Sequence, residues 1–328
     1  MMTRVHRRPP PTFTRRGFHR QLAGFLAAGA ASASCSLPGS SLRERDGRPR
    51  GRFVDIHTHL GQQWGARGAL TVPYLLDWMD EHEVAQAVVL PLISPESWDH
   101  PVTTDYVLER TADHRDRLIP FCSIDPRTVN LANHQARRDL LERYRDAGAR
   151  GFGEHKPGVA IDDPRNQSLF RACAEVGLPI LFHLDTVRNF DAPGLPGLES
   201  VLRAIPEATF IAHAQGWWAN ISGEVTQAQM QAYPTGPVAP GGAVDRLLSA
   251  YPNLYGDLSA GSGANAISRD PAFGREFVLR NAGQLLFGTD VLRPDQEVAQ
   301  FELYASLELP GEVGSLVFRD NARRILGV

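Results

Sequence analysis

The chain has 328 residues, of which 42% are hydrophobic and 22% are charged, the ordinary composition of a globular protein. This length fits one large α/β barrel or two smaller domains, so length alone does not choose between them. The formal net charge is −3, and a mildly acidic chain argues against nucleic-acid binding through bulk electrostatics.

The first 34 residues have the composition of an export signal. They contain six arginines and no acidic residue, and an apolar run from Leu22 to Ala33 follows the basic part. That run is too short to remain as a membrane-spanning helix. Arg15-Arg16-Gly17-Phe18 resembles a twin-arginine signal. Removal of residues 1–34 takes six arginines away, so the formal charge changes from −3 to −9.

Two kinds of processing fit this leader. Cleavage after Ala33 is one, and lipidation of Cys35 is the other, because Ser32-Ala33-Ser34-Cys35 loosely resembles a lipoprotein box. The alternative to an export signal is an untargeted, disordered basic tail. We expect a signal peptide over residues 1–34, a linker over 35–51 and an exported protein, either periplasmic or lipid-anchored at the cell envelope. Membrane association is expected only if Cys35 is lipidated.

From residue 52 onward, short apolar or β-branched runs alternate with amphipathic stretches. The expected strands are residues 52–57, 86–93, 118–124, 150–155, 179–184, 209–213, 254–258 and 284–288. The expected helices are residues 73–82, 104–114, 135–147, 167–176, 197–204, 243–251, 271–281 and 295–307, with Asn166 as the N-cap of the fourth. This alternation predicts an α/β protein, a single-domain (β/α)8 TIM barrel over residues 52–328. An open doubly wound sheet is the alternative.

Side chains that can bind a metal follow the ends of the expected strands, where barrel enzymes place their catalytic groups. They are His57 and His59 (first strand), Glu154 (fourth), His183 (fifth), His213 (sixth) and Asp290 (after the eighth). Residues i and i+2 of a strand face the same side, so the two imidazoles of the first pair can share one ion at about 2.1 Å. A His-x-His pair alone is only a hypothesis. The joint occurrence predicts a metal, because burying so many such groups without a cation is costly.

Lys156 is the only lysine among 34 basic residues and lies two positions after Glu154. Both side chains are therefore expected on one face of the fourth strand. A lone lysine there indicates a chemical need for a flexible point charge, or else a leftover lysine at the rim of the barrel.

The loops offer weaker candidates for substrate contacts. Arg188 and Arg293 could bind a substrate carboxylate, although ordinary salt bridges in loops are the alternative. Trp217 and Trp218 lie in the long break over residues 214–241 and could line an apolar substrate or pack the loop. The glycine-rich run that starts at Asp257 resembles a phosphate loop only superficially.

Several motifs resemble the amidohydrolase superfamily: Phe53-Val54-Asp55-Ile56-His57-Thr58-His59, Phe182-His183, Ile211-Ala212-His213 and Phe287-Gly288-Thr289-Asp290. More specifically they resemble its amidohydrolase-related (amidohydrolase 2) branch of TIM-barrel metal-dependent hydrolases, which includes decarboxylases, hydratases and lactone hydrolases of carboxylate substrates. The closing Asp320-Asn321-Ala322-Arg323-Arg324-Ile325-Leu326 is similar to the final helix of that branch. The resemblance covers residues 52–328.

The resemblance implies that His57, His59 and Asp290 bind one metal. His183 would bind that same ion or join His213 on a second one. Glu154 occupies what looks like the place of the lysine that bridges two ions in many members. The expected cofactor is therefore one or two divalent ions, zinc first, with Mn, Fe or Co as alternatives.

A metal ion generates hydroxide from its bound water near neutral pH. Asp290 would accept the proton and pass it to the leaving group. His213, if it is not a ligand, would polarise the scissile carbonyl, and Lys156 is a third catalytic candidate.

We expect a metal-dependent hydrolase that cleaves an amide, ester or lactone bond of a small molecule. The alternatives are a decarboxylase or hydratase of a carboxylate substrate and, third, a barrel that only binds a ligand. The expected partner is a small-molecule substrate, with a carboxylate as one option and no nucleic acid. A homodimer is left open.

Overall fold

The computed structural model describes residues 49–62, 68–97, 100–128 and 133–328. The expected signal peptide, Cys35 and most of the expected linker lie outside these residues. Within the described part of the chain, none of the helices has the length and apolar character needed to cross a membrane.

Eight parallel strands form the centre of the described structure. They are β1 (Phe53–Thr58), β2 (Val84–Val89), β3 (Leu118–Pro120), β4 (Phe152–His155), β5 (Ile180–His183), β6 (Phe210–His213), β7 (Leu254–Asp257) and β8 (Leu285–Leu286). The ladders run β1-β2-β3 and β4-β5-β6-β7-β8, and every pair is parallel. Each expected strand is therefore present. The first is shifted by one residue at the same length, and the other seven are shorter.

Backbone hydrogen bonds join these two sheets at both junctions. Between β3 and β4, the Cys122 amide donates to the Gly151 carbonyl at 2.9 Å. Between β1 and β8, the Ile56 amide donates to the Phe287 carbonyl at 3.0 Å. The eight strands thus close into a ring, which agrees with the predicted barrel and not with the open sheet.

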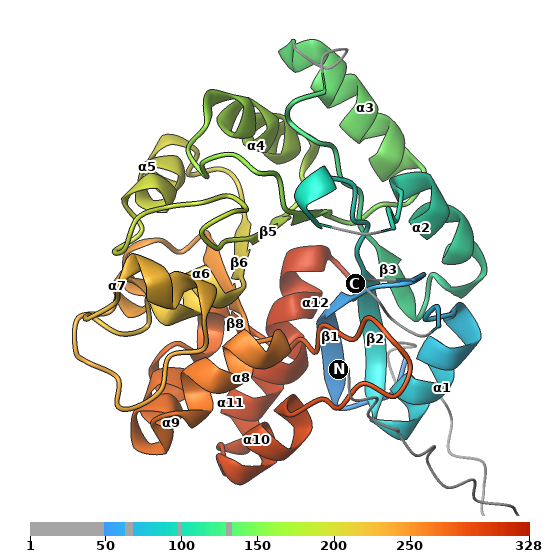
Figure 1. The fold of residues 1–328 in the computed structure, drawn as a ribbon. Coiled ribbons are helices and arrows are strands. Elements are labelled where there is room, and N and C mark those ends of the chain that lie inside the picture. The colour runs from blue at the N-terminus through green and yellow to red at the C-terminus, as the bar shows by residue number, and fades with distance from the viewer. Residues whose placement is uncertain (1–48, 63–67, 98–99, 129–132) are drawn as a thin grey trace, which may run out of the picture. The chain divides into compact units, whose positions relative to one another are not determined.

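Helices surround the ring (Figure 1). The eight expected ones are α1 (Val72–Glu81), α2 (Thr104–Arg110), α3 (His134–Asp146), α4 (Pro164–Val176), α5 (Pro196–Ala204), α7 (Ala243–Ala250), α9 (Pro271–Arg280) and α10 (Gln300–Ser306). Further helices are α6 (Gln215–Ala219), α8 (Ala260–Ser268), α11 (Gly311–Ser315), the π-helical η6 (Leu316–Asp320) and α12 (Asn321–Leu326). Short 3₁₀ turns are η1 (Pro95–Ser97), η2 (Ala112–His114), η4 (Gln227–Gln231) and η5 (Ala282–Gln284). Helices α6 and η4 lie inside the break that was expected as a loop.

The expected N-cap of α4 was wrong. The helix begins at Pro164, and the side chain of Asp163 accepts a hydrogen bond from the Arg165 amide. Proline suits the first helical position because its fixed φ is helical and its missing N–H would have had no partner there. Asn166 lies inside the first turn instead, where its buried side-chain oxygen faces His155 Nε2 at 2.9 Å.

An inner hydrophobic cluster fills the ring and meets α12. It is formed by Ala322 and Leu326 together with alternate residues that lie on the strands or directly after them: Val54, Ile56, Val88, Leu90, Ile119, Phe121, Leu181, Ile211, Tyr255 and Leu286. The buried Asn321 side chain donates to the carbonyl oxygens of Ala282 and Leu285 at 2.7 and 3.0 Å, just before and at the start of β8. Helix α12 therefore covers the amino-terminal end of the ring and leaves the carboxyl-terminal end for a site.

The tryptophan pair, for which the sequence left substrate contact and loop packing open, is part of the core. Trp217 and Trp218 are buried, and the Trp218 indole donates to the Asp257 carbonyl at 2.8 Å. The two tryptophans thus pack the segment after β6 under the site rather than line its surface. Cys122 and Cys173 are free and buried.

The Asp55 carboxyl group ties β1 to the segment after β8. Its Oδ1 atom accepts hydrogen bonds from the His57 and Thr289 amides, both at 3.0 Å, and its Oδ2 accepts one from the Thr289 hydroxyl. The side chain is completely buried, and this burial raises the pKa of Asp55 to about 7 despite the hydrogen bonds.

Metal-free Asp55→Asn protein is expected to lose less stability with rising pH than the wild type. A carboxyl group whose pKa is higher in the folded than in the unfolded state stabilises the protein below the unfolded pKa of about 3.9. That contribution disappears as the pH rises through 7. Urea denaturation should therefore show the wild type losing up to about 4 kcal/mol relative to the variant between pH 4 and pH 8.

The exposed Asp77→Asn on α1 provides a matched control for this comparison. Parallel stability curves for wild type and Asp55→Asn would contradict the expectation.

Candidate metal centre

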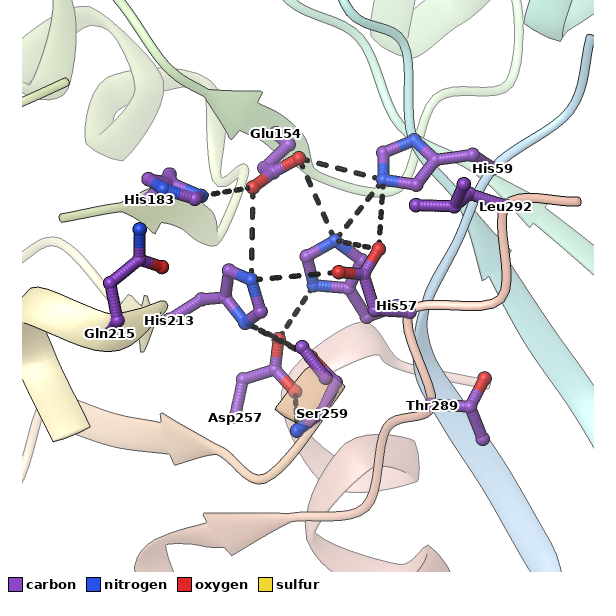
Figure 2. A network of polar contacts seen from close by, with 12 residues as sticks. His57, His59, Glu154, His183, His213, Gln215, Asp257, Ser259, Thr289 and Leu292 are labelled. Carbon is purple, nitrogen blue, oxygen red and sulfur yellow. Dashed lines mark hydrogen bonds and ion pairs between the residues drawn. The ribbon is translucent and has the colours of Figure 1, made fainter. Parts of the chain in front are cut away.

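His57 and His59 converge at the carboxyl-terminal end of β1, as their spacing predicts. Their Nε2 atoms lie 3.2 Å apart, and Figure 2 shows both rings directed at the same point. The pairing of β1 with β2 is irregular between Asp55 and Thr58. The alternation of side chains between the two faces of β1 is therefore interrupted near His57 and His59. Both imidazoles are nevertheless buried and face the site.

The outer nitrogen of each ring has a partner that only accepts hydrogen bonds. His57 Nδ1 lies 2.7 Å from Asp257 Oδ2, and His59 Nδ1 lies 3.0 Å from the Leu90 carbonyl oxygen. These partners place the proton of each neutral imidazole on Nδ1. Each Nε2 atom then carries a lone pair, and two lone pairs 3.2 Å apart in a buried site require a cation between them.

Two carboxylate oxygens complete a set of four donor atoms. Glu154 Oε2 lies 3.6 and 3.5 Å from the Nε2 atoms of His57 and His59. Asp290 Oδ1 lies 3.5 and 3.4 Å from the same two atoms. A tetrahedral ion with ligands at about 2.1 Å separates its ligand atoms by about 3.4 Å. The separations between each carboxylate and the two imidazoles are close to that value, and His57, His59 and Asp290 form a candidate ligand group with Glu154 beside it.

The charges around these four donor groups stabilise a positive charge at the centre of the site. Burial alone lowers the pKa of His57 and of His59, but the carboxylates outweigh it and raise the pKa of both, that of His57 well above its usual value. For Asp290, burial opposes ionisation, yet His57 and His59 bring the pKa of the carboxyl down to about 2. The carboxylates thus remain ionised at neutral pH and attract a cation, a proton or a metal.

Glu154 joins two parts of the site. Its Oε2 accepts a hydrogen bond from Lys156 Nζ at 2.8 Å, and its Oε1 lies 2.9 Å from His183 Nδ1. Burial raises the pKa of Glu154, but the Lys156 charge and the neighbouring imidazoles hold it well below its usual range. Lys156 itself is only 4% exposed, so it lies inside the site and is not a lysine at the rim.

His183 lies between two carboxylates. Opposite Glu154, its Nε2 atom is 3.0 Å from Asp185 Oδ2, and the same oxygen accepts a hydrogen bond from Arg188 at 2.7 Å. Arg188 therefore forms a salt bridge within the loop after β5, the alternative to a substrate contact. Arg293 is exposed.

His213 directs its inner nitrogen at both carboxylates of the site. Its Nδ1 is held by Asp257 Oδ2 at 3.1 Å and the Ser259 hydroxyl at 3.0 Å. Its Nε2 lies 3.9 Å from Glu154 Oε1 and 4.0 Å from Asp290 Oδ2. Burial and the nearby His57 lower the pKa of His213. The six residues predicted from strand ends are thus all brought together.

Asp257 is the residue that sequence reasoning missed. One of its oxygens faces the Nδ1 atoms of both His57 and His213, and Ser259 donates to the same oxygen at 2.9 Å. Burial opposes ionisation of Asp257, but the two imidazoles lower its pKa well below its usual range. Its position at the end of β7 was the available signal, since the same rule located the other six. Asp185, two residues beyond His183, was missed in the same way.

Comparisons with solved structures identify the fold. An uncharacterized TIM-barrel protein from Bordetella bronchiseptica is 17% identical, with a TM-score of 0.55 over 78% of this chain and 83% of that one. A probable 2-pyrone-4,6-dicarboxylic acid hydrolase from Acinetobacter baumannii, with citric acid bound, is 13% identical, with a TM-score of 0.57 over 84% and 100%. A 5-carboxyvanillate decarboxylase from Sphingomonas paucimobilis is 14% identical, with a TM-score of 0.50 over 77% and 82%.

At such low identities these similarities concern the fold alone. No curated protein sequence matches the chain significantly. The model of the amidohydrolase family, in contrast, matches residues 54–328, a segment that contains every residue of the site described above. The chain therefore belongs to the amidohydrolase family, in its amidohydrolase 2 branch.

Proposed function

We propose that this protein is a metal-dependent hydrolase that binds one divalent ion through His57, His59, Glu154 and Asp290. The observation that carries the proposal is the pair of imidazole Nε2 atoms at 3.2 Å, with two ionised carboxylates that each lie 3.4–3.6 Å from both nitrogens. Membership of a family whose enzymes typically use metals supports it.

The donor set suits the ions that imidazole and carboxylate bind well. Zinc is the first choice, and Mn, Fe or Co are alternatives. When bound, such an ion supplies hydroxide at neutral pH by lowering the pKa of a water ligand to about 7.

Asp290 and His213 are placed to assist the reaction. The Asp290 side chain is 18% exposed, the most accessible of the four donors, and its carboxylate is ionised at neutral pH. It can accept a proton through one oxygen and deliver it to a leaving group. His213 directs Nε2 into the same space and can polarise a substrate carbonyl. We therefore propose Asp290 as the proton carrier and His213 as the polarising group.

The bond that is cleaved belongs to a small amide, ester or lactone in this proposal. A second candidate is decarboxylation or hydration of a carboxylate on the same residues. It is supported by the similar fold of a protein described as a 5-carboxyvanillate decarboxylase. The similar hydrolase is named for a substrate that is a dicarboxylic acid. Carboxylate-bearing compounds are therefore the first substrate class to test for hydrolysis and for decarboxylation.

The double variant His57→Ala/His59→Ala is expected to lose its bound metal and its activity together. Removal of both imidazoles leaves only the two carboxylates of the donor set. Metal content after dialysis and turnover of a panel of lactones, esters and aromatic carboxylates measure the two effects. His134→Ala is the matched control, because this exposed histidine pairs only with Glu175 in the described contacts. A double variant that kept both metal and activity would sink the proposal.

The Asp257→Asn variant is expected to bind zinc about 10- to 100-fold more weakly, because outer carboxylates orient metal-binding imidazoles and strengthen them as ligands. The amide offers no negative charge to His57 or His213. Competition titration with a chelating dye gives the dissociation constants. Asp185→Asn is the control, since Asp185 faces His183 and none of the four donors. Equal weakening by both variants would speak against a specific role for Asp257.

We also propose that residues 1–34 direct export and are removed or lipidated. Expression in a bacterium with a twin-arginine pathway should give a cell-envelope product that lacks the leader, while Arg15→Lys/Arg16→Lys should accumulate inside the cell. Mass spectrometry of the mature end distinguishes cleavage after Ala33 from lipidation of Cys35. An intact, cytoplasmic wild-type product would contradict this part of the proposal.

A further inference from the structure

A second group of donor atoms lies beside the first. It consists of Glu154 Oε1, His183 Nδ1 and His213 Nε2, which lie within 4.8 Å of one another. Oε1 is 2.9 Å from the His183 nitrogen and 3.9 Å from the His213 nitrogen. Glu154 directs one oxygen at each group (Figure 2). Distances alone would therefore allow two ions bridged by this carboxylate.

The two groups differ in their hydrogen bonds. In the first, the Nδ1 atoms of His57 and His59 each face an acceptor, and their Nε2 atoms face each other at 3.2 Å. In the second, the two ring nitrogens of His183 each face a carboxylate oxygen, at 2.9 Å for Glu154 and 3.0 Å for Asp185. Both nitrogens of His183 thus already have a hydrogen-bond partner within the protein. The opposed nitrogens of the first group call for a cation, whereas His183 in the second group has a carboxylate partner at each ring nitrogen.

Lys156 holds a fixed positive charge against the carboxylate that would bridge the ions. Its Nζ atom donates to Glu154 Oε2 at 2.8 Å from a side chain that is 4% exposed. The backbone around it is anchored, because Ser97 donates to the Lys156 carbonyl at 3.0 Å and Asn189 donates to the His155 carbonyl at 2.6 Å. The ammonium group is therefore held over Glu154 by the fold.

The charge of Lys156 opposes a second dication. One ion on the first group already shares Glu154 with the ammonium group, and Asp290 supplies the other negative charge among its four donors. A second ion would add two positive charges to the same carboxylate without a new anionic ligand, since His183 and His213 bring none. Repulsion between like charges is strong in a buried site, where water screens it weakly.

We propose that Lys156 limits this centre to a single ion by occupying the bridging carboxylate with an ammonium charge. The inference rests on the proposed function, in that the first group must bind a metal. It assigns a role to the one lysine of the chain. Arginine at the same position would preserve the charge, whereas methionine of similar length would remove it.

The test is the zinc stoichiometry of the full chain, measured by equilibrium dialysis and elemental analysis with zinc as the only added metal. Wild type and Lys156→Arg are expected to bind one zinc per chain, and Lys156→Met two. The first zinc should bind Lys156→Met at least tenfold more tightly, because the nearby ammonium charge is gone. Adding His183→Ala to Lys156→Met should return the stoichiometry to one.

The outcomes separate the two proposals. Two zinc ions in the wild type, or one in Lys156→Met, would overturn the role of Lys156 and leave the proposed hydrolase intact. No zinc in the wild type would overturn the proposed function itself, and this inference with it. If Lys156→Met does not fold, as judged by circular dichroism, Lys156→Gln removes the same charge and takes its place in the comparison.

Discussion

The close approach of two imidazole nitrogens is the constraint on which the site depends. His57 and His59 bring Nε2 atoms to 3.2 Å, and the outer nitrogens of both rings donate to groups that only accept. Without a cation, this buried arrangement sets one lone pair against another. The carboxylates of Glu154 and Asp290 add negative charge at the same point, so the environment as a whole selects a positively charged occupant.

The barrel makes this arrangement possible because it is rigid and closed. Backbone hydrogen bonds join β3 to β4 and β1 to β8, and the Asp55 carboxyl group reinforces the second junction. Residues far apart in the chain therefore meet at one end of the ring, while α12 covers the other. A flexible scaffold would let the charged groups move apart, whereas the closed ring holds them in place.

Charge also explains how the donor group around His57 and His59 differs from the neighbouring group of Glu154, His183 and His213. Glu154 serves both groups, yet Lys156 neutralises much of its charge, and Asp185 satisfies the far side of His183. Asp257 provides the carboxylate partner for the Nδ1 atoms of both His57 and His213. The same residue types thus form a candidate cation site in one place and a hydrogen-bond network in the next. The partner that faces each ring nitrogen and the position of one ammonium group make the difference.

Sequence alone determined the alternation of strands and helices, the barrel, and the six side chains at strand ends, because local periodicity and the placement of barrel sites are both readable along the chain. It did not reveal Asp257 or Asp185, whose roles exist only through contacts with histidines on the same or other strands. It placed the N-cap of α4 at Asn166, whereas the helix begins at Pro164 because the Asp163 side chain caps it. Only the tertiary structure separates the candidate metal ligands from the neighbouring group of Glu154, His183 and His213. The separation depends on which partner faces each ring nitrogen, and contacts between strands fix those partners.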